Sequence, residues 1–176
     1  MTREQLIERI KSLAVLHGEF TLRSGKKSRY YVDKYRFETQ PDVLRGLGKL
    51  FAAHVTPDVD RIAGPELGAV CLAAATSMES NRPFVMVRKA AKEYGTTKRI
   101  EGVLLPGEKV LIVEDVLTTG GAVLEAAKSL TDAGAVIVKI VGVIDRMEGA
   151  RANIEAAGFE VDALFTIADL GIESQR

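Results

Sequence analysis

The chain has 176 residues, of which 47% are hydrophobic and 27% are charged, a balance typical of one folded domain with a substantial core. Its formal net charge is +0 at pH 7, which argues against a nucleic-acid-binding protein. The single cysteine, Cys71, excludes an internal disulfide and a cysteine-based metal cluster. The N-terminus lacks the apolar core of a signal peptide. No stretch approaches the ~20 apolar residues of a membrane span, so we expect a cytoplasmic protein without membrane contacts.

The first part of the chain predicts a small appendage. Apolar residues recur at helical spacing over residues 3–16 and predict an amphipathic helix. The aromatic and β-branched residues that follow, interrupted at Ser24-Gly25, indicate a strand pair with a turn. Pro41 then opens a second helix that runs to about Val55. We interpret residues 1–40 as an N-terminal hood on a single domain that comprises residues 1–176.

From residue 60 onward, predicted strands and helices alternate. The expected strands are residues 60–64, 83–89, 109–116, 135–145 and 163–170, and the expected helices are residues 66–80, 120–134 and 149–158. The strands are nearly continuous runs of Val, Ile and Leu, as in strands that are buried on both faces. This order predicts an α/β fold with a Rossmann-like parallel sheet flanked by helices.

The stretch KVLIVEDVLTTGGAV, residues 109–123, carries the clearest chemistry. It places Glu114 and Asp115 at the carboxyl end of a strand, where open α/β sheets bind ligands. The backbone N–H groups of residues 118–121 and the helix that begins there can hold an anion, most commonly phosphate. The two carboxylates would repel a phosphate but suit sugar hydroxyls. The segment therefore predicts a site for a ribose 5-phosphate; the alternative is a flexible turn beside solvated acids.

Two further stretches offer charges that complement such a ligand. The long segment between the strands at 83–89 and 109–116 carries Arg88, Lys89 and Lys92, and a loop of this kind is often a lid. Its cations suit a departing pyrophosphate, although a solvated basic loop is the alternative. Arg146 follows the strand at 135–145, and its planar guanidinium fits a carboxylate. A surface salt bridge is the alternative there.

The sequence VLIVEDVLTTGGA resembles the 5-phospho-α-D-ribosyl 1-diphosphate (PRPP) signature of type I phosphoribosyltransferases. Three more stretches resemble the orotate phosphoribosyltransferases in particular. They are FTLRSGKKSRYYVDKY (residues 20–35), VRKAAKEYG (87–95) and GVIDRMEG (142–149). In that family they hold the orotate ring, form a mobile basic lid and bind the orotate carboxylate, respectively. The resemblance extends from about Leu6 to Leu170.

The resemblance implies transfer of the ribosyl 5-phosphate group from PRPP to orotate, which gives orotidine 5′-monophosphate and diphosphate in pyrimidine (UMP) biosynthesis. It also implies a Mg²⁺ ion held mainly by PRPP, diphosphate and water, without dedicated protein ligands, and a homodimer whose lid closes over the neighbouring active site. A phosphoribosyltransferase for a purine base and a non-catalytic PRPP-sensing regulator are the alternatives.

The resemblance also assigns roles to individual residues. The expected catalytic residues are Lys89, Lys92 and Asp115. The expected PRPP contacts are Arg23, Arg88, Lys89, Lys92, Tyr94, Glu114, Asp115, Val116, Leu117, Thr118, Thr119, Gly120, Gly121 and Ala122. The expected orotate contacts are Tyr31, Val32, Thr118 and Arg146.

Three positions depart from the family pattern. Arg23 takes the place of a lysine, and Tyr94 stands where many members have a histidine. The stretch GPELGAV, residues 64–70, matches the family's pyrophosphate loop but contains no lysine. Its backbone amides would have to bind the pyrophosphate, with more of the positive charge supplied by the lid.

Overall fold

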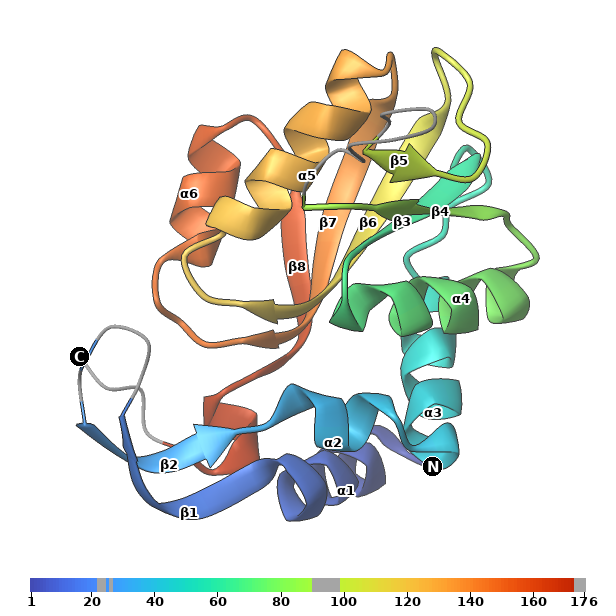
Figure 1. Ribbon diagram of the computed structural model, residues 1–176. Helices are drawn as coiled ribbons and strands as arrows, with labels where there is room; N and C mark the ends of the chain where they lie inside the picture. The colour runs from blue at the N-terminus through green and yellow to red at the C-terminus, as the bar shows by residue number, and fades with distance from the viewer. Residues whose placement is uncertain (22–24, 26, 90–98, 173–176) are drawn as a thin grey trace.

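The centre of the molecule is a six-stranded sheet with the strand order β5-β4-β3-β6-β7-β8 (Figure 1). The computed structural model describes residues 1–21, 25, 27–89 and 99–172. The strands are β3 (Arg61–Pro65), β4 (Phe84–Val87), β5 (Ile100–Glu101), β6 (Lys109–Leu117), β7 (Val136–Asp145) and β8 (Val161–Thr166). All neighbouring pairs are parallel except β4 and β5, which are antiparallel. The predicted α/β fold with a central parallel sheet is confirmed.

Helices cover both faces of this sheet, which explains why β6 is apolar at every position from Val110 to Val113. The main helices are α3 (Pro41–Ala52), α4 (Gly68–Ser80), α5 (Gly121–Asp132) and α6 (Ala150–Ala156). Leu111 and Val113 pack in one core cluster with α3 and α4, whereas Val110 and Ile112 pack in a second cluster with α5 and α6. Successive strand residues point to opposite faces, so both faces of β6 must be apolar. Within the described ranges, no helix has the length and apolar character needed to cross a membrane.

The N-terminal hood shares its core with the rest of the domain. It consists of α1 (Arg3–Ala14), β1 (Val15–Thr21), β2 (Lys27–Val32) and the short helix α2 (Lys34–Glu38), and β1 and β2 are antiparallel. A reciprocal pair of hydrogen bonds between Thr2 and Gln5 caps α1. Leu6, Ile10 and Phe37 are fully or almost fully buried in the same cluster as α3 and α4. This packing holds α2 against the edge of the sheet where the strands end.

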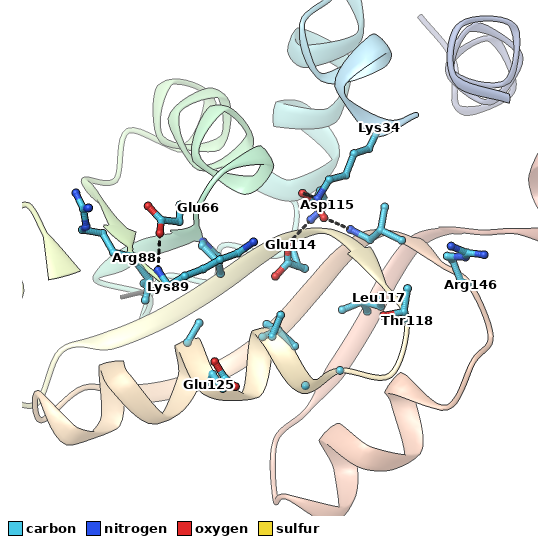
Figure 2. A pocket seen from close by; sticks show the side chains of 18 of the residues that line it. Lys34, Glu66, Arg88, Lys89, Glu114, Asp115, Leu117, Thr118, Glu125 and Arg146 are labelled. Carbon is cyan, nitrogen blue, oxygen red and sulfur yellow. Dashed lines mark hydrogen bonds and ion pairs between the residues drawn. The ribbon is translucent and has the colours of Figure 1, made fainter. Parts of the chain in front are cut away.

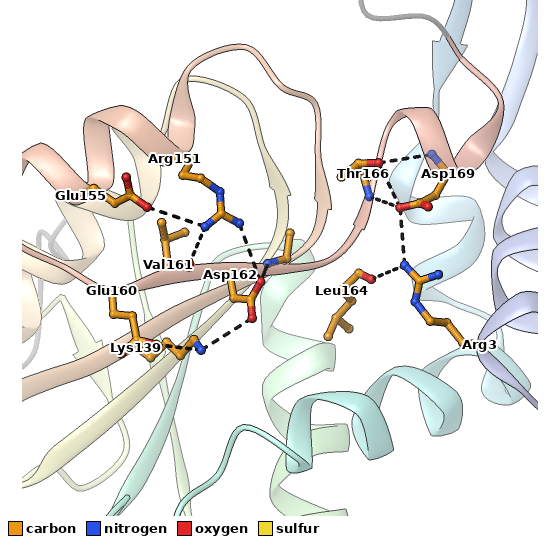
Figure 3. A network of polar contacts seen from close by, with 11 residues as sticks. Arg3, Lys139, Arg151, Glu155, Glu160, Val161, Asp162, Leu164, Thr166 and Asp169 are labelled. Atoms are coloured by element: carbon orange, nitrogen blue, oxygen red, sulfur yellow. Dashed lines mark hydrogen bonds and ion pairs between the residues drawn. The ribbon is translucent and has the colours of Figure 1, made fainter.

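Polar contacts of Arg3 join the hood to the last strand (Figure 3). The Arg3 guanidinium donates a hydrogen bond of 3.1 Å to the Leu164 carbonyl oxygen and lies 3.5 Å from the Asp169 carboxylate. It also lies 5.1 Å from the centre of the Phe165 ring. Because these side chains are partly exposed, each contact contributes only a fraction of a kcal/mol, roughly 0.2–1. Their main effect is to fix how α1 lies against β8.

The element boundaries differ from the prediction where tertiary contacts decide them. The helix expected over residues 3–16 ends at Ala14, and the next residue begins β1. The last strand, expected at 163–170, spans Val161–Thr166 instead, and Ala168–Leu170 forms a 3₁₀ helix (η1). There the Asp169 carboxylate accepts hydrogen bonds from the backbone N–H and hydroxyl of Thr166, which turns the chain out of the strand. The short elements α2 and β5 were not predicted.

Candidate active site

A cavity of about 810 Å³ opens at the carboxyl ends of β3, β4, β6 and β7 (Figure 2). The hood closes one side of it, and the start of α5 forms the opposite side. The predicted site residues that line it are Tyr31, Val32, Arg88, Lys89, Glu114, Asp115, Val116, Leu117, Thr118, Gly120, Gly121, Ala122 and Arg146. Thr119 is exposed and does not belong to this lining. Arg23, Lys92 and Tyr94 lie outside the described residues.

The two acids at the end of β6 are buried and held by specific donors. Glu114 accepts a 2.9 Å hydrogen bond from the Asp115 backbone N–H, and Asp115 Oδ1 accepts one of 2.6 Å from the Val116 N–H. Asp115 Oδ2 pairs with Lys34 Nζ at 2.5 Å. Burial, reinforced by the charge of Asp115, raises the pKa of Glu114 well above its ordinary value. The site thus offers two fixed carboxyl groups, which suit a diol.

The loop after β6 is shaped to leave its N–H groups available to a ligand. The carbonyl oxygens of Thr118 and Thr119 accept hydrogen bonds from α6, which turns them away from the cavity. Gly120 has a φ of +84°, and a Cβ at this position would lie 3.1 Å from Ile154. Gly120 also has no side chain that could cap α5, so the first N–H groups of that helix are free for an anion. These features are compatible with the predicted phosphate cradle.

The described ends of the basic loop are tied together beside the cavity. The Arg88 N–H donates to the Arg99 carbonyl oxygen at 2.7 Å, and the Arg99 guanidinium donates back to the carbonyl oxygens of Arg88 and Lys89 at 3.2 and 2.8 Å. The Lys89 N–H donates a 2.6 Å hydrogen bond to Glu66 Oε1, on the loop after β3. These contacts anchor Arg88 and Lys89 at the rim of the cavity.

The residues predicted to hold the base lie on another side of the same cavity. Tyr31 and Val32, at the end of β2, line it, and the Tyr31 side chain is exposed and packs against Phe20. Arg146 begins the loop after β7, with its backbone N–H bonded to the Leu117 carbonyl oxygen at 2.9 Å. Its guanidinium pairs with Glu148 at 3.0 Å, while its buried Nε has no partner in the part of the chain that the structure describes. Arg146 lines the cavity, where its planar guanidinium suits a ligand carboxylate.

Two residues of α2, Lys34 and Glu38, were missed by the sequence analysis. Lys34 lines the cavity. Glu38 is 2% exposed, and both of its carboxyl oxygens are buried without a partner among the described residues. Burial, followed by the charge of Asp115, raises the pKa of Glu38 to about 8. The only sequence signal was the spacing of four residues between a lysine and a glutamate, which places both on one face of a helical turn.

The carboxyl groups of Asp115 and Glu38 both lie close to Gly68, the first residue of α4. A Cβ at this position would lie 2.6 and 2.8 Å from the two Glu38 carboxyl oxygens and closer still to Asp115 Oδ2. The site therefore requires a residue without a side chain at the start of α4. Just before it, Pro65 and Glu66 line the cavity, and the Leu67 side chain is 69% exposed.

A parallel sheet with two adjacent acids at its carboxyl edge, followed by a glycine-containing loop and a helix, is the arrangement of a phosphoribosyltransferase. The family profile described as "Phosphoribosyl transferase domain" matches residues 36–169. The orotate phosphoribosyltransferase of Methanocella arvoryzae is 47% identical over 167 residues, which cover 94% of this chain and 95% of the relative. The chain therefore belongs to the orotate phosphoribosyltransferase family.

Solved structures agree with this assignment. The crystal structure of Mycobacterium tuberculosis orotate phosphoribosyltransferase in complex with Fe(III) dicitrate superposes with a TM-score of 0.88 at 36% identity, and the match covers 97% of this chain and 99% of the other. A structure of the same enzyme in complex with PRPP superposes with a TM-score of 0.84 at 34% identity and the same coverage.

Proposed function

We infer that the chain catalyses the reaction of orotate with PRPP, which gives orotidine 5′-monophosphate and diphosphate. One observation supports this most strongly. One cavity is lined by the loop after β6, by the two acids Glu114 and Asp115 and, beside Thr118, by Arg146, which places candidate groups for a phosphate, a ribose diol and a carboxylate together. The enzyme is thus a pentosyltransferase, and we place it in the biosynthesis of pyrimidine nucleotides.

The geometry indicates how PRPP would be oriented. The loop of residues 118–122 would bind the 5-phosphate through backbone N–H groups. Glu114 and Asp115 would hold the ribose hydroxyls by hydrogen bonds, and the Asp115 carboxylate would stabilise positive charge on the sugar as the bond from C1 to the diphosphate loosens. Arg88 and Lys89, together with Lys92 of the lid, would neutralise the leaving diphosphate. No covalent intermediate is needed, because positioning and electrostatics suffice.

Orotate would enter from the side of the hood. The backbone at Tyr31 and Val32 would lie against the pyrimidine, and Thr118 lies within the same lining. Arg146 would bind the orotate carboxylate through its guanidinium, with the ring nitrogen directed at C1 of the ribose. A purine base has no carboxylate for Arg146 to bind, which makes the purine alternative the weaker one.

Mg²⁺ is part of the proposal. The ion would be held by oxygens of PRPP and by water, and the carboxylates that line the cavity, including Glu66, can accept hydrogen bonds from such waters. When bound, it would offset the charge of the diphosphate. Within the described residues, no group of three or more His, Cys, Asp or Glu side chains is placed to hold a metal ion. We expect activity to vanish with a chelator and to return with added Mg²⁺.

Comparison of bases tests the substrate directly. The absorbance of orotate should fall when enzyme, PRPP and Mg²⁺ are combined, whereas adenine, guanine and hypoxanthine should give no nucleotide. Arg146→Ala should raise the KM for orotate at least 10-fold and change the KM for PRPP much less. Formation of a purine nucleotide at a comparable rate would exclude the assignment to orotate. PRPP binding without turnover of any base would instead favour the regulator.

We also propose a cytoplasmic homodimer in which the lid of one subunit completes the site of the other. Mixing Lys92→Ala and Asp115→Ala subunits tests this, because Lys92 belongs to the lid and Asp115 to the cavity, so each heterodimer would contain one site with both residues intact. We expect activity well above that of either variant alone. Heterodimers that are shown to form but remain inactive would argue against a shared site.

A further inference from the structure

The loop after β3 is poorly suited by its own charge to hold a diphosphate. Within residues 64–70 the only charged side chain is Glu66, which is negative. If the 5-phosphate lies in the loop of residues 118–122 and the ribose diol lies on Asp115, the diphosphate at C1 faces this loop and the start of α4. A ligand with several negative charges needs a cation there.

Lys34 is placed to provide that charge. Its Nζ lies 2.5 Å from Asp115 Oδ2, and its half-buried side chain lines the cavity. The same Asp115 oxygen is the atom that a Cβ on Gly68 would strike first. The Lys34 ammonium and the start of α4 therefore meet at one carboxylate oxygen. Figure 2 shows Lys34 extending from α2 down to Asp115, with Glu66, Arg88 and Lys89 to the other side of Asp115.

The ammonium can serve a ligand without leaving Asp115. It carries three N–H donors, and Asp115 takes one of them. Burial acts to lower the pKa of Lys34, but the charge of Asp115 and its hydrogen bond outweigh burial and raise the pKa. Lys34 is therefore positively charged throughout the neutral pH range.

The other cations of the cavity are placed elsewhere. Arg99 donates to loop carbonyl oxygens, and Arg88 lies 3.8 Å from Glu101. Arg146 lies beside Thr118, on the side assigned to orotate (Figure 2). A diphosphate that lies between α4 and the basic loop would have Arg88 and Lys89 on one side. Lys34 is the cation that the described part of the chain places on the opposite side of the diphosphate.

We propose that Lys34, on the hood, binds the diphosphate group of PRPP and supplies the positive charge that the loop of residues 64–70 lacks. This rests on the proposed function, since it assumes that the cavity binds PRPP. It assigns to the hood a role in binding the leaving group, in addition to its expected role in holding the base.

Calorimetry on Lys34→Met tests the proposal, with Arg36→Gln, an exposed cation of the same helix, as the matched control. Inorganic diphosphate with Mg²⁺ and orotidine 5′-monophosphate are the two probes, because the second has the diol and the 5-phosphate but no diphosphate. Loss of a charge-assisted contact should weaken diphosphate binding by roughly 10- to 100-fold. Binding of orotidine 5′-monophosphate should change by less than about 3-fold. Lys34→Arg should retain most of the affinity for diphosphate, and Arg36→Gln should behave as wild type.

Other outcomes would overturn the proposal. Wild-type affinity of Lys34→Met for diphosphate would exclude the contact. Equal loss for both probes would mean that Lys34 supports the structure of the whole site and makes no specific contact with the diphosphate. Absence of diphosphate binding by the wild-type protein would also count against it. Orotate turnover by the wild-type protein is measured in the same preparation, so failure of the proposed function would be recognised separately, as an absence of product.

Discussion

Replacement of Gly68 by alanine should disable the site while leaving the fold intact. Gly68 has a backbone conformation that other residues adopt without strain, so the effect comes from contact alone. The new methyl group would lie 2.6 and 2.8 Å from the Glu38 oxygens and closer still to Asp115 Oδ2. Ordinary contact requires 3.4 Å or more, so the Asp115 carboxylate must retreat by roughly 1 Å.

A displacement of that size at a group that positions substrate costs on the order of 100-fold in rate. The atoms that must move belong to the buried carboxylates of Glu38 and Asp115, so we expect the free energy of unfolding to fall by roughly 1–3 kcal/mol, which still leaves a folded protein. The assay is kcat/KM for PRPP with orotate as acceptor, alongside urea unfolding. Gly46→Ala, inside α3, is the control, because the atoms nearest to its methyl group would be the side-chain ends of Leu6 and Met1, away from the site. A folded Gly68→Ala enzyme within 3-fold of wild-type activity would refute the reasoning.

Two further predictions concern charge and stability. The pKa of Glu38 is raised from 4.5 to about 8, so the folded protein retains a proton that the unfolded chain loses, and stability falls as pH rises between these values. Glu38→Gln should remove this dependence and be more stable than wild type at pH 9 by on the order of 2 kcal/mol in urea unfolding; parallel curves for the two proteins between pH 5 and 9 would contradict it. Glu108 forms two hydrogen bonds, of 2.5 and 2.7 Å, with the largely buried Arg61, far from the cavity lining. Glu108→Gln should cost about 2 kcal/mol of stability at unchanged kcat, and a drop in kcat without loss of stability would contradict that assignment.

The sheet and the strand-loop-helix segment that contains Gly120 could be predicted because their signals are local. β6 is apolar on both faces since it is covered on both, and this appears directly as the run KVLIV. The cradle is one continuous strand-loop-helix segment, so its geometry follows from Gly120 and the start of α5. Arg146 needed the resemblance to a family, because an arginine after a strand is not specific by itself.

Lys34 and Glu38 could not be predicted in the same way. They lie on a helix of five residues, too short for a periodic pattern. Their importance arises from Asp115, 81 positions away from Lys34, and from Gly68. Only the packing of the hood onto α4 brings these groups together, and such packing leaves no local trace in the sequence. The end of β8 was misjudged for a similar reason, since a side-chain contact of Asp169 ends the strand.

A crystal structure of the protein with PRPP and Mg²⁺ would test the central claim most directly. We predict the 5-phosphate on the backbone N–H groups of residues 118–122 and the ribose hydroxyls on Glu114 and Asp115, with the diphosphate directed toward the start of α4. A 5-phosphate bound anywhere else, or a ribose whose hydroxyls face away from these two acids, would contradict the account.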